Sequence, residues 1–321
     1  VCSQAPIALT LNTNGTSVAA ASYDITAINV APGLIAGGSN VVVPQSNVLV
    51  NYLAADTYTN TGNSALNVTY TAVPRSAAGC FGNPVVITIT INPEPVISSI
   101  LNAAVCSDVA TGLVLSTEAG SVAAASYNVT ARTIAGGLTA AGGNAFVPVV
   151  GVAAGYLSGD RFTNVTAGPL NVTYTVQAVS AAGCVGASRV ITLTINPEPV
   201  VSNSLDATAC SDVVIGLTLN TNGTSVAAAN YNITSRTVAG GLVIGGGNAA
   251  IPAVAVAANY LATDTYTNTG VAPLNVTYTV VPVSAAGCLG DAKIITITIN
   301  PEPVISSGLN KSACSNSPIA L

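Results

Sequence analysis

Cysteine is the residue in this chain whose type and spacing most clearly suggest chemistry. The stretch SAAGC ends at Cys80, and the same five letters return 104 residues later at Cys184 and again at Cys288. A second series keeps the same interval: Cys2, Cys106, Cys210 and Cys314. Thiols on a fixed interval, without a CxxC pair of the kind that binds zinc, favour disulfides over a metal site. We therefore expect disulfide bonds and an oxidising, extracellular location.

Groups suited to catalysis are scarce. The sequence has no histidine, and none of its seven lysines and arginines occupies a position that is basic in every repeat. Nucleophilic catalysis needs a hydroxyl or thiol beside a base, and carboxylate-pair catalysis needs two acids close together. The twelve acidic residues are scattered along the chain. The sequence thus predicts a protein that is not an enzyme, with no cofactor and no bound metal.

Two acidic positions do recur. Glu94, Glu198 and Glu302 stand in the NPEP motif, and Asp56, Asp160 and Asp264 are each followed four residues later by asparagine. The Asp and Asn of this second motif offer two oxygen ligands, so calcium binding is one alternative. Calcium takes six to eight oxygens, usually with several carboxylates, whereas this motif supplies one carboxylate. The favoured interpretation is structural, with Asp and Asn capping a turn through hydrogen bonds to the backbone.

Threonine alternates with apolar residues in the two last expected strands of each repeat. These residues are Thr69, Thr71, Thr88, Thr90, Thr173, Thr175, Thr192, Thr194, Thr277, Thr279, Thr296 and Thr298. Threonine is favoured at solvent-facing strand positions, so the preferred interpretation is that these residues have no role beyond forming the strands. A second hypothesis is a self-association or ligand face, because only 6% of the residues are charged and sheets usually deter association with charge.

The bulk composition excludes some partners. The net charge of −5 argues against nucleic acid, which requires a basic surface. Polar residues interrupt every apolar run before the roughly 18 to 20 residues of a transmembrane helix. The chain opens with VCSQAPIAL and closes with ACSNSPIAL. We therefore expect a section of a longer array, whose secretion signal and anchor lie elsewhere and in which Cys314 pairs with a cysteine beyond the section.

The elements expected to carry these residues are strands. LNVTYTAV at 66–73 and VITITIN at 86–92 alternate apolar and polar residues, and a turn-rich segment between them indicates a hairpin. IALTLN at 7–12 and SYDITAINV at 22–30 are two further expected strands. Several short strands in about 100 residues favour an all-β fold of tandem immunoglobulin-like β-sandwiches.

The repeat length sets the domain organisation. One repeat of 104 residues has the size of a whole domain rather than of a solenoid unit. The predicted domains are sandwich repeats at 1–104, 105–208 and 209–312, followed at 313–321 by the first strand of a fourth.

We expect the first strand of each sandwich to begin at the same end of the domain as the loop of the last hairpin. The two cysteines of one repeat would then lie at the same end, close enough for a disulfide, which needs about 4.4 to 6.8 Å between the two Cα atoms. We therefore predict one disulfide within each domain. The predicted pairs are Cys2–Cys80, Cys106–Cys184 and Cys210–Cys288.

Three motifs together carry a family resemblance: the opening CS, the late VTYT with SAAGC, and the closing ITINPEP. They resemble the PKD-like, immunoglobulin-like tandem repeats of large bacterial surface proteins, and the resemblance covers nearly the whole chain. It implies a secreted β-sandwich array that serves as an adhesin stalk or a surface filament.

The predicted function is therefore structural, as a cell-surface filament or adhesin stalk whose partners are other copies of the chain. The alternative is an array of carbohydrate-binding or surface-binding adhesion modules, with surface glycans as partners. Copies could join by stacking or by strand exchange through the closing segment 313–321; the sequence leaves both routes open.

Overall fold

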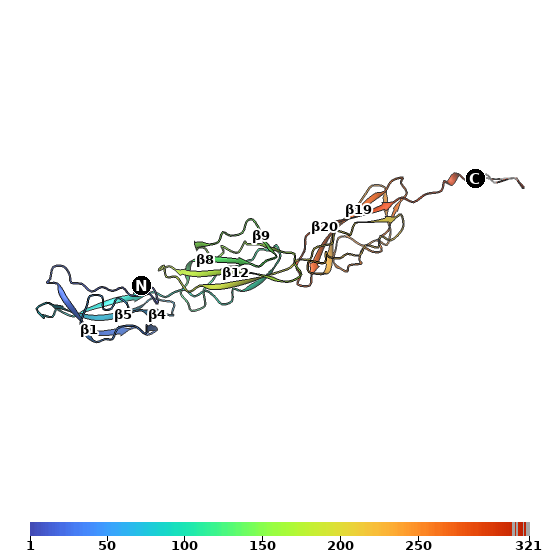
Figure 1. Ribbon diagram of the computed structural model, residues 1–321. Helices are drawn as coiled ribbons and strands as arrows, with labels where there is room; N and C mark the ends of the chain where they lie inside the picture. The colour runs from blue at the N-terminus through green and yellow to red at the C-terminus, as the bar shows by residue number, and fades with distance from the viewer. Residues whose placement is uncertain (310–311, 313, 317, 319–321) are drawn as a thin grey trace.

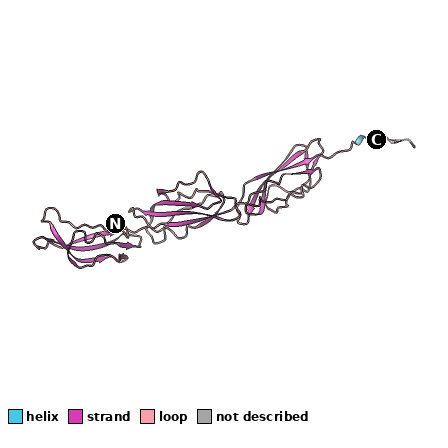
Figure 2. Ribbon diagram, viewed as in Figure 1, coloured by secondary structure: helices cyan, strands magenta, loops and turns pink. Residues whose placement is uncertain are grey.

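The computed structural model describes residues 1–321 except 310–311, 313, 317 and 319–321. Its described part is almost wholly strand and loop, with one short 3₁₀ helix, η1, at Ser307–Leu309. Figures 1 and 2 show three β-rich domains following one another end to end. The all-β class predicted from the alternating sequence is confirmed.

The second domain shows the complete sheet. β12 (Leu170–Ser180) lies in the middle, between β8 (Ala124–Ile134) and β13 (Arg189–Asn196), while β10 (Val149–Val152) and β7 (Ala103–Cys106) form the two edges. Alternation along β12 decides which face is covered, because Val172, Tyr174 and Val176 are buried and the threonines between them are half-exposed.

The opposite layer of each sandwich contains fewer regular strands. In the second domain it contains a two-stranded sheet of β9 (Leu138–Ala140) and β11 (Phe162–Asn164), together with irregular extended chain. The strand predicted at 7–12 belongs to this layer in the first domain, but it forms no regular strand. Its backbone N–H groups make isolated hydrogen bonds instead of a regular ladder, from Ile7 to the Asp56 carbonyl, from Ala8 to the Ala54 carbonyl and from Leu11 to the Val50 carbonyl.

The third domain repeats the second. Its strands are β14 (Ala207–Cys210), β15 (Ala228–Val238), β16 (Leu242–Ile244), β17 (Ala253–Val256), β18 (Tyr266–Asn268), β19 (Leu274–Ser284) and β20 (Lys293–Asn300). Its large sheet has the order β14-β20-β19-β15-β17, and β16 pairs with β18.

The first domain has a four-stranded sheet, in the order β3-β1-β5-β6, where the others have five strands. Its strands are β1 (Ala20–Val30), β2 (Leu34–Ala36), β3 (Gln45–Val48), β4 (Tyr58–Asn60), β5 (Leu66–Ser76) and β6 (Val85–Ile91). The fifth strand is reduced to one parallel bridge between Cys2 and Asn92.

Three separate hydrophobic cores lie along the chain, and their boundaries differ from the boundaries of the predicted sequence repeats. The buried residues run from Ile7 to Ile91 in the first core, from Ile97 to Ile195 in the second and from Val201 to Ile299 in the third. Ile97 therefore packs in the second domain although it precedes residue 105. The frames 1–104, 105–208 and 209–312 remain a prediction of sequence units. The predicted strand at 313–321 falls largely outside the described residues.

Candidate functional site

The two ends of each sandwich carry different cysteines. β7 runs parallel to β13, and Cys106, its last residue, lies opposite Asn196 at the far end of β13. Cys184 lies in the hairpin that precedes β13. An eight-residue strand is about 26 Å long, so the two cysteines of one repeat lie at opposite ends of the domain, too far apart for a disulfide.

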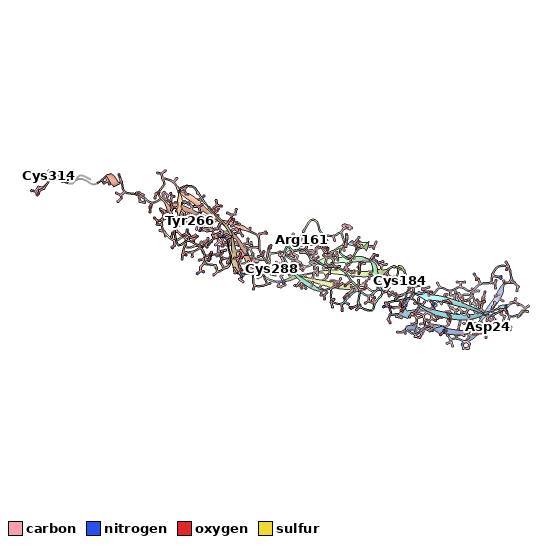
Figure 3. The ribbon with its side chains drawn as sticks, turned by 180° about the vertical axis from the view of Figure 1, so that it is seen from behind. Asp24, Arg161, Cys184, Tyr266, Cys288 and Cys314 are labelled. Carbon is pink, nitrogen blue, oxygen red and sulfur yellow. A yellow bond between two sulfur atoms is a disulfide. The ribbon has the colours of Figure 1, made fainter. Side chains whose placement is uncertain are left out.

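The disulfides consequently join neighbouring domains. Cys2 of the first domain bonds Cys184 of the second, with 5.4 Å between Cα atoms, and Cys106 of the second bonds Cys288 of the third, at 5.3 Å. In Figure 3, Cys184 and Cys288 mark the two joints. Cys80, Cys210 and Cys314 are free and exposed.

The intradomain pairing predicted from the sequence is therefore wrong. The structure contains neither Cys2–Cys80 nor Cys106–Cys184 nor Cys210–Cys288. The prediction placed the start of the first strand at the hairpin end of the sandwich. The parallel pairing of β7 with β13 instead puts the first-strand cysteine at the other end, beside the next domain.

The chain that crosses each joint also builds the next domain. After Pro95, Val96 N–H donates to Ser121 Oγ at 2.8 Å and Ser98 N–H donates to the Ser116 carbonyl at 2.9 Å. The second joint repeats the pattern, since Val200 N–H donates to Ser225 Oγ and Ser202 N–H to the Asn220 carbonyl. The segments after the first two Pro-Glu-Pro motifs thus hydrogen-bond along the layer opposite the large sheet.

An aliphatic side chain anchors each crossing segment. Ile97 is 1% exposed in the second core, and Val201 is 3% exposed in the third. Burying a side chain of this size stabilises the fold by about 1.5–3 kcal/mol. No strand was expected from the sequence at these positions, although the pair of apolar residues after each proline, Val96–Ile97 and Val200–Val201, was a signal for an inward-facing side chain.

The hairpin of each following domain touches the crossing chain closely. A Cβ placed on Gly186 would lie 1.8 Å from the Pro95 carbonyl oxygen, and one on Gly290 would lie 1.9 Å from that of Pro199. Only glycine leaves room for these approaches. The bonded cysteines Cys184 and Cys288 lie two residues before these glycines and are buried.

The second joint also encloses an acidic group. Glu198, in the Pro-Glu-Pro of that joint, is buried. Burial, and then the negative charges of Asp108 and Asp291, raise the pKa of its carboxyl to about 7. At the first joint, burial alone raises the pKa of Glu94.

The recurring aspartates lie in the domain interiors and bond as the structural interpretation predicted. Asp160 Oδ1 accepts from Ala145 N–H at 2.6 Å, and its Oδ2 accepts from the Tyr174 hydroxyl at 2.5 Å. Arg132 lies 3.4 Å from the same carboxylate. Asp56 and Asp264 make the equivalent backbone and tyrosine bonds. Among the described residues no group of three or more His, Cys, Asp and Glu is placed to hold a metal ion.

The threonines predicted as a face lie together on the outer side of the large sheets. Thr69 pairs with Thr88 across β5 and β6, and Thr173 pairs with Thr192 across β12 and β13. The third domain repeats this register with Thr277 opposite Thr296. The structure thus brings the candidate residues onto one face per domain; whether the face binds anything stays a prediction.

Comparison with known proteins identifies the repeats. A family model described as PKD-like domain matches residues 1–95, 151–199 and 247–303, which is more than half of the chain. The chain belongs to the PKD-like domain family. The family resemblance expected from the sequence motifs is thereby confirmed.

The matches among solved structures have low sequence identity and low TM-scores. Human CDH23 EC21-23 is 13% identical, covers 87% of this chain and 88% of its own, and has a TM-score of 0.26. Chicken CNTN1 FN1-FN3 is 12% identical, with coverages of 87% and 90% and a TM-score of 0.24. The sialic acid binding region of a Streptococcus sanguinis adhesin is 12% identical, with coverages of 87% and 71% and a TM-score of 0.19.

The comparison with curated proteins found no match. Within the residues that the structure describes, no helix has the length and apolar character needed to cross a membrane.

Proposed function

We propose that this chain is a structural extracellular protein that forms a surface filament or the stalk of an adhesin. The observation that carries the proposal is the double connection at each joint, where a disulfide and a crossing segment tie one domain to the next. A linker held by neither would leave the domains free to pivot, which is the ordinary expectation for domains in series.

The mechanical consequence follows from where the two connections attach. The disulfide joins the far end of one large sheet to the hairpin of the next, while the crossing segment fills the next core. Bending the joint therefore requires breaking backbone hydrogen bonds or withdrawing a buried side chain. Three domains, each roughly 35 to 45 Å long by strand geometry, would act as one rod of about 100 Å or more.

The disulfides support the extracellular part of the proposal, because such bonds persist in oxidising compartments. A binding role remains the alternative from the sequence. The half-exposed threonine rows are the surface on which it would rest. Glycan binding whose affinity rises with the number of repeats would favour that alternative.

Stiffness can be tested on the purified, oxidised chain by small-angle X-ray scattering and electron microscopy. We expect straight rods, and a broad distribution of interdomain angles for the double variant C2S/C184S, which loses the first disulfide. The matched control, C80S/C210S, removes two cysteines that are free and should stay straight. Equal straightness of all three proteins would argue against the disulfide as the stiffening element.

Location can be tested with an antibody against the chain on native cells. Label along regular filaments or projecting fibres would support the proposal. Label confined to the cell interior would contradict it.

A further inference from the structure

The two joints inside the chain share a disulfide and a crossing segment, but they differ where the neighbouring domains touch. At the second joint, Val226 N–H of the third domain donates to the Thr166 carbonyl of the second domain at 3.0 Å. At the first joint, Val122 occupies the position equivalent to Val226 and lines an open cleft. The second joint is therefore closed at a place where the first joint is open.

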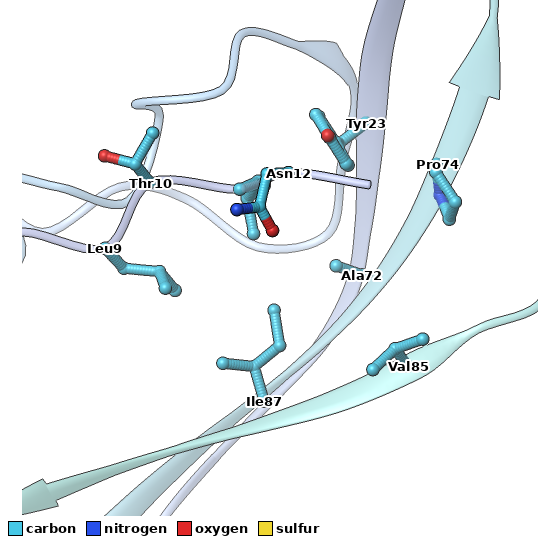
Figure 4. A pocket seen from close by; sticks show the side chains of 9 residues that line it. Leu9, Thr10, Asn12, Tyr23, Ala72, Pro74, Val85 and Ile87 are labelled. Atoms are coloured by element: carbon cyan, nitrogen blue, oxygen red, sulfur yellow. The ribbon is translucent and has the colours of Figure 1, made fainter. Parts of the chain in front are cut away.

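The cleft at the first joint has a volume of about 310 Å³. It is lined from the first domain by Asn63, Ala65, Asn92 and Pro93, and from the second domain by Val122, Ala123, Ser180, Ala181 and Ala182. A groove of about 290 Å³ lies instead within the first domain, beside Tyr23 and Ile87 (Figure 4). The openness of the first joint thus belongs to the way in which its two domains meet.

Glu198 is connected to the closing contact of the second joint through the residues at the end of β11. Its N–H donates to the Asn164 carbonyl at 3.0 Å, and the Asn164 side chain accepts from Thr166 Oγ1 at 2.7 Å. Glu198 is only 3% exposed, whereas Glu94 at the first joint is half-buried. A change of charge at Glu198 therefore takes place beside the bond that Val226 makes across the joint.

Two carboxylates face Glu198, one from each domain. Asp108 follows β7 in the second domain, and Asp291 lies in the hairpin before β20 of the third domain. Burial, and then the negative charges of these two residues, raise the pKa of Glu198 to about 7. A hydrogen bond from Ser107 acts in the opposite direction.

The basic side chains of the same loops are directed to other acceptors. Arg161 donates to the Asp108 carbonyl at 2.7 Å, and Lys293 Nζ donates to Asn203 Oδ1 at 3.0 Å. Among the residues that the structure describes, no lysine or arginine lies within ion-pair distance of Glu198. Ionisation of Glu198 therefore adds a third negative charge to the joint without a positive charge to balance it.

The first joint has neither of the two carboxylates. Gln4 stands there in place of Asp108, and Ala187 stands in place of Asp291. Gln4 and Asp108 have the same left-handed backbone conformation, with φ of 61° and 58°, so the exchange alters the charge while keeping the turn. The chain thus contains a matched joint of the same fold without these charges.

We infer that the second joint is a hinge controlled by protonation of Glu198. While the carboxyl is protonated, the joint is closed. When it is ionised beside Asp108 and Asp291, the third domain tilts away and the bond between Val226 and Thr166 breaks. The inference rests on the proposed rod, because it states the condition under which one joint of that rod yields.

Two connections keep the movement small. The disulfide between Cys106 and Cys288 joins the loops that carry Asp108 and Asp291. Val201 of the crossing segment remains buried in the third core. The third domain therefore tilts about this end and does not separate from the second domain.

The direction of the pH dependence follows from proton binding. In the closed joint the pKa of Glu198 is about 7, whereas access of water in the open joint returns it toward the ordinary value of 4.5. The closed joint thus binds more protons than the open joint. Closing is fully favoured below about pH 4.5, weakens about tenfold for each pH unit up to about 7, and changes no further above that.

Hydrogen exchange in the full, oxidised chain, followed by NMR, measures the closing contact directly. The protection factor of the Val226 amide should fall at least about tenfold between about pH 5 and about pH 8. The Leu219 amide is the control, since it donates to the Ala258 carbonyl inside the third domain, and its protection should change less. Equal falls at the two amides would mean that the whole domain unfolds and would overturn the hinge, as would constant protection of Val226.

Two variants of the second joint test the assigned groups. E198Q should give Val226 the same protection at both pH values, because the amide side chain does not ionise. D108Q/D291A gives the second joint the residues of the first and should reduce the fall in protection. A fall as large in either variant as in the unchanged chain would overturn the inference.

The reverse exchange, Q4D/A187D, places the two charges at the first joint. The pKa of Glu94, followed through the chemical shift of its carboxyl carbon, should rise toward that of Glu198, because two negative charges then face it. An unchanged pKa of Glu94 would overturn the role given to the two aspartates.

The outcome is independent of the test of stiffness. Constant protection of Val226 in straight rods would refute the hinge and leave the rod standing. A broad distribution of interdomain angles at about pH 5 would contradict the rod. Protection of Val226 that still fell with rising pH in such chains would nevertheless support the hinge.

Discussion

At the scale of single residues, a buried aspartate in each domain accepts a hydrogen bond from a buried tyrosine hydroxyl. Tyr174 donates to Asp160 Oδ2 from inside the second core, and burial followed by this bond raises the pKa of the tyrosine. The hydroxyl is therefore neutral and able to donate at any pH that the fold tolerates. Its role is to donate a hydrogen bond to the buried Asp160 carboxylate, whose other oxygen accepts from Ala145 N–H.

Replacing Tyr174 by phenylalanine tests this role. We expect Y174F to lower the free energy of unfolding by about 1–3 kcal/mol, because a buried acceptor loses its donor. Y156F is the control, since the Tyr156 hydroxyl donates to the Phe146 carbonyl at an exposed site and should matter less. Denaturant unfolding of the oxidised proteins measures both, and equal losses would contradict the assignment.

Glu198 makes the second joint sensitive to pH. A carboxyl whose pKa rises from 4.5 to about 7 on folding binds more protons in the folded state than in the unfolded state. Its contribution to stability is therefore complete below the lower value and is lost as the pH rises through about 7. E198Q should remove this dependence.

The measurement for Glu198 is the free energy of unfolding at about pH 5 and about pH 8. We expect the difference between the two pH values to shrink by about 1–3 kcal/mol in E198Q. E94Q is the matched variant at the first joint, where burial raises the pKa without the two aspartates, and its effect should be smaller. A larger effect of E94Q would refute the role of Asp108 and Asp291.

At this scale the sequence predicted part of the site. The spacing of Asp56, Asp160 and Asp264 indicated a structural role, and their hydrogen bonds confirm it. The effect of Asp291 on Glu198 could not be predicted, because the two residues belong to different domains. That effect depends on how the domains meet, which no local pattern encodes.

At the scale of elements, the crossing segment is the part that sequence reasoning missed. The two last strands of each repeat were predicted from strict alternation, and β5, β6 and their equivalents follow it. The segment after Pro95 contains too few alternating residues for a confident strand. Its partners, Ser116 and Ser121, lie about twenty residues further along, so its place is set by tertiary contacts.

Two isoleucines in this segment give a sharp comparison. I97A should lower the free energy of unfolding of the second domain by about 2–4 kcal/mol, because it leaves a cavity in a packed core. I100A is the matched control, since Ile100 is 84% exposed, and it should change stability by less than about 0.5 kcal/mol. Similar losses for both variants would contradict the burial of Ile97.

At the scale of the whole molecule, the 104-residue interval of the cysteines is compatible with two networks. Pairing within repeats gives separate, internally closed domains, whereas pairing between repeats gives a continuous covalent rod. Spacing alone does not decide between them, because both keep the interval. The direction of β7 beside β13 decides it, and that direction is a property of the folded sheet.

Disulfide mapping tests the central claim most directly. The oxidised chain, with its free thiols blocked, is digested without reduction, and the linked peptides are identified by mass spectrometry. The structure predicts Cys2 joined to Cys184 and Cys106 joined to Cys288, with Cys80 and Cys210 blocked in the monomer. Peptides linking Cys2 to Cys80 or Cys106 to Cys184 would contradict this pairing and would show that each disulfide lies within one domain.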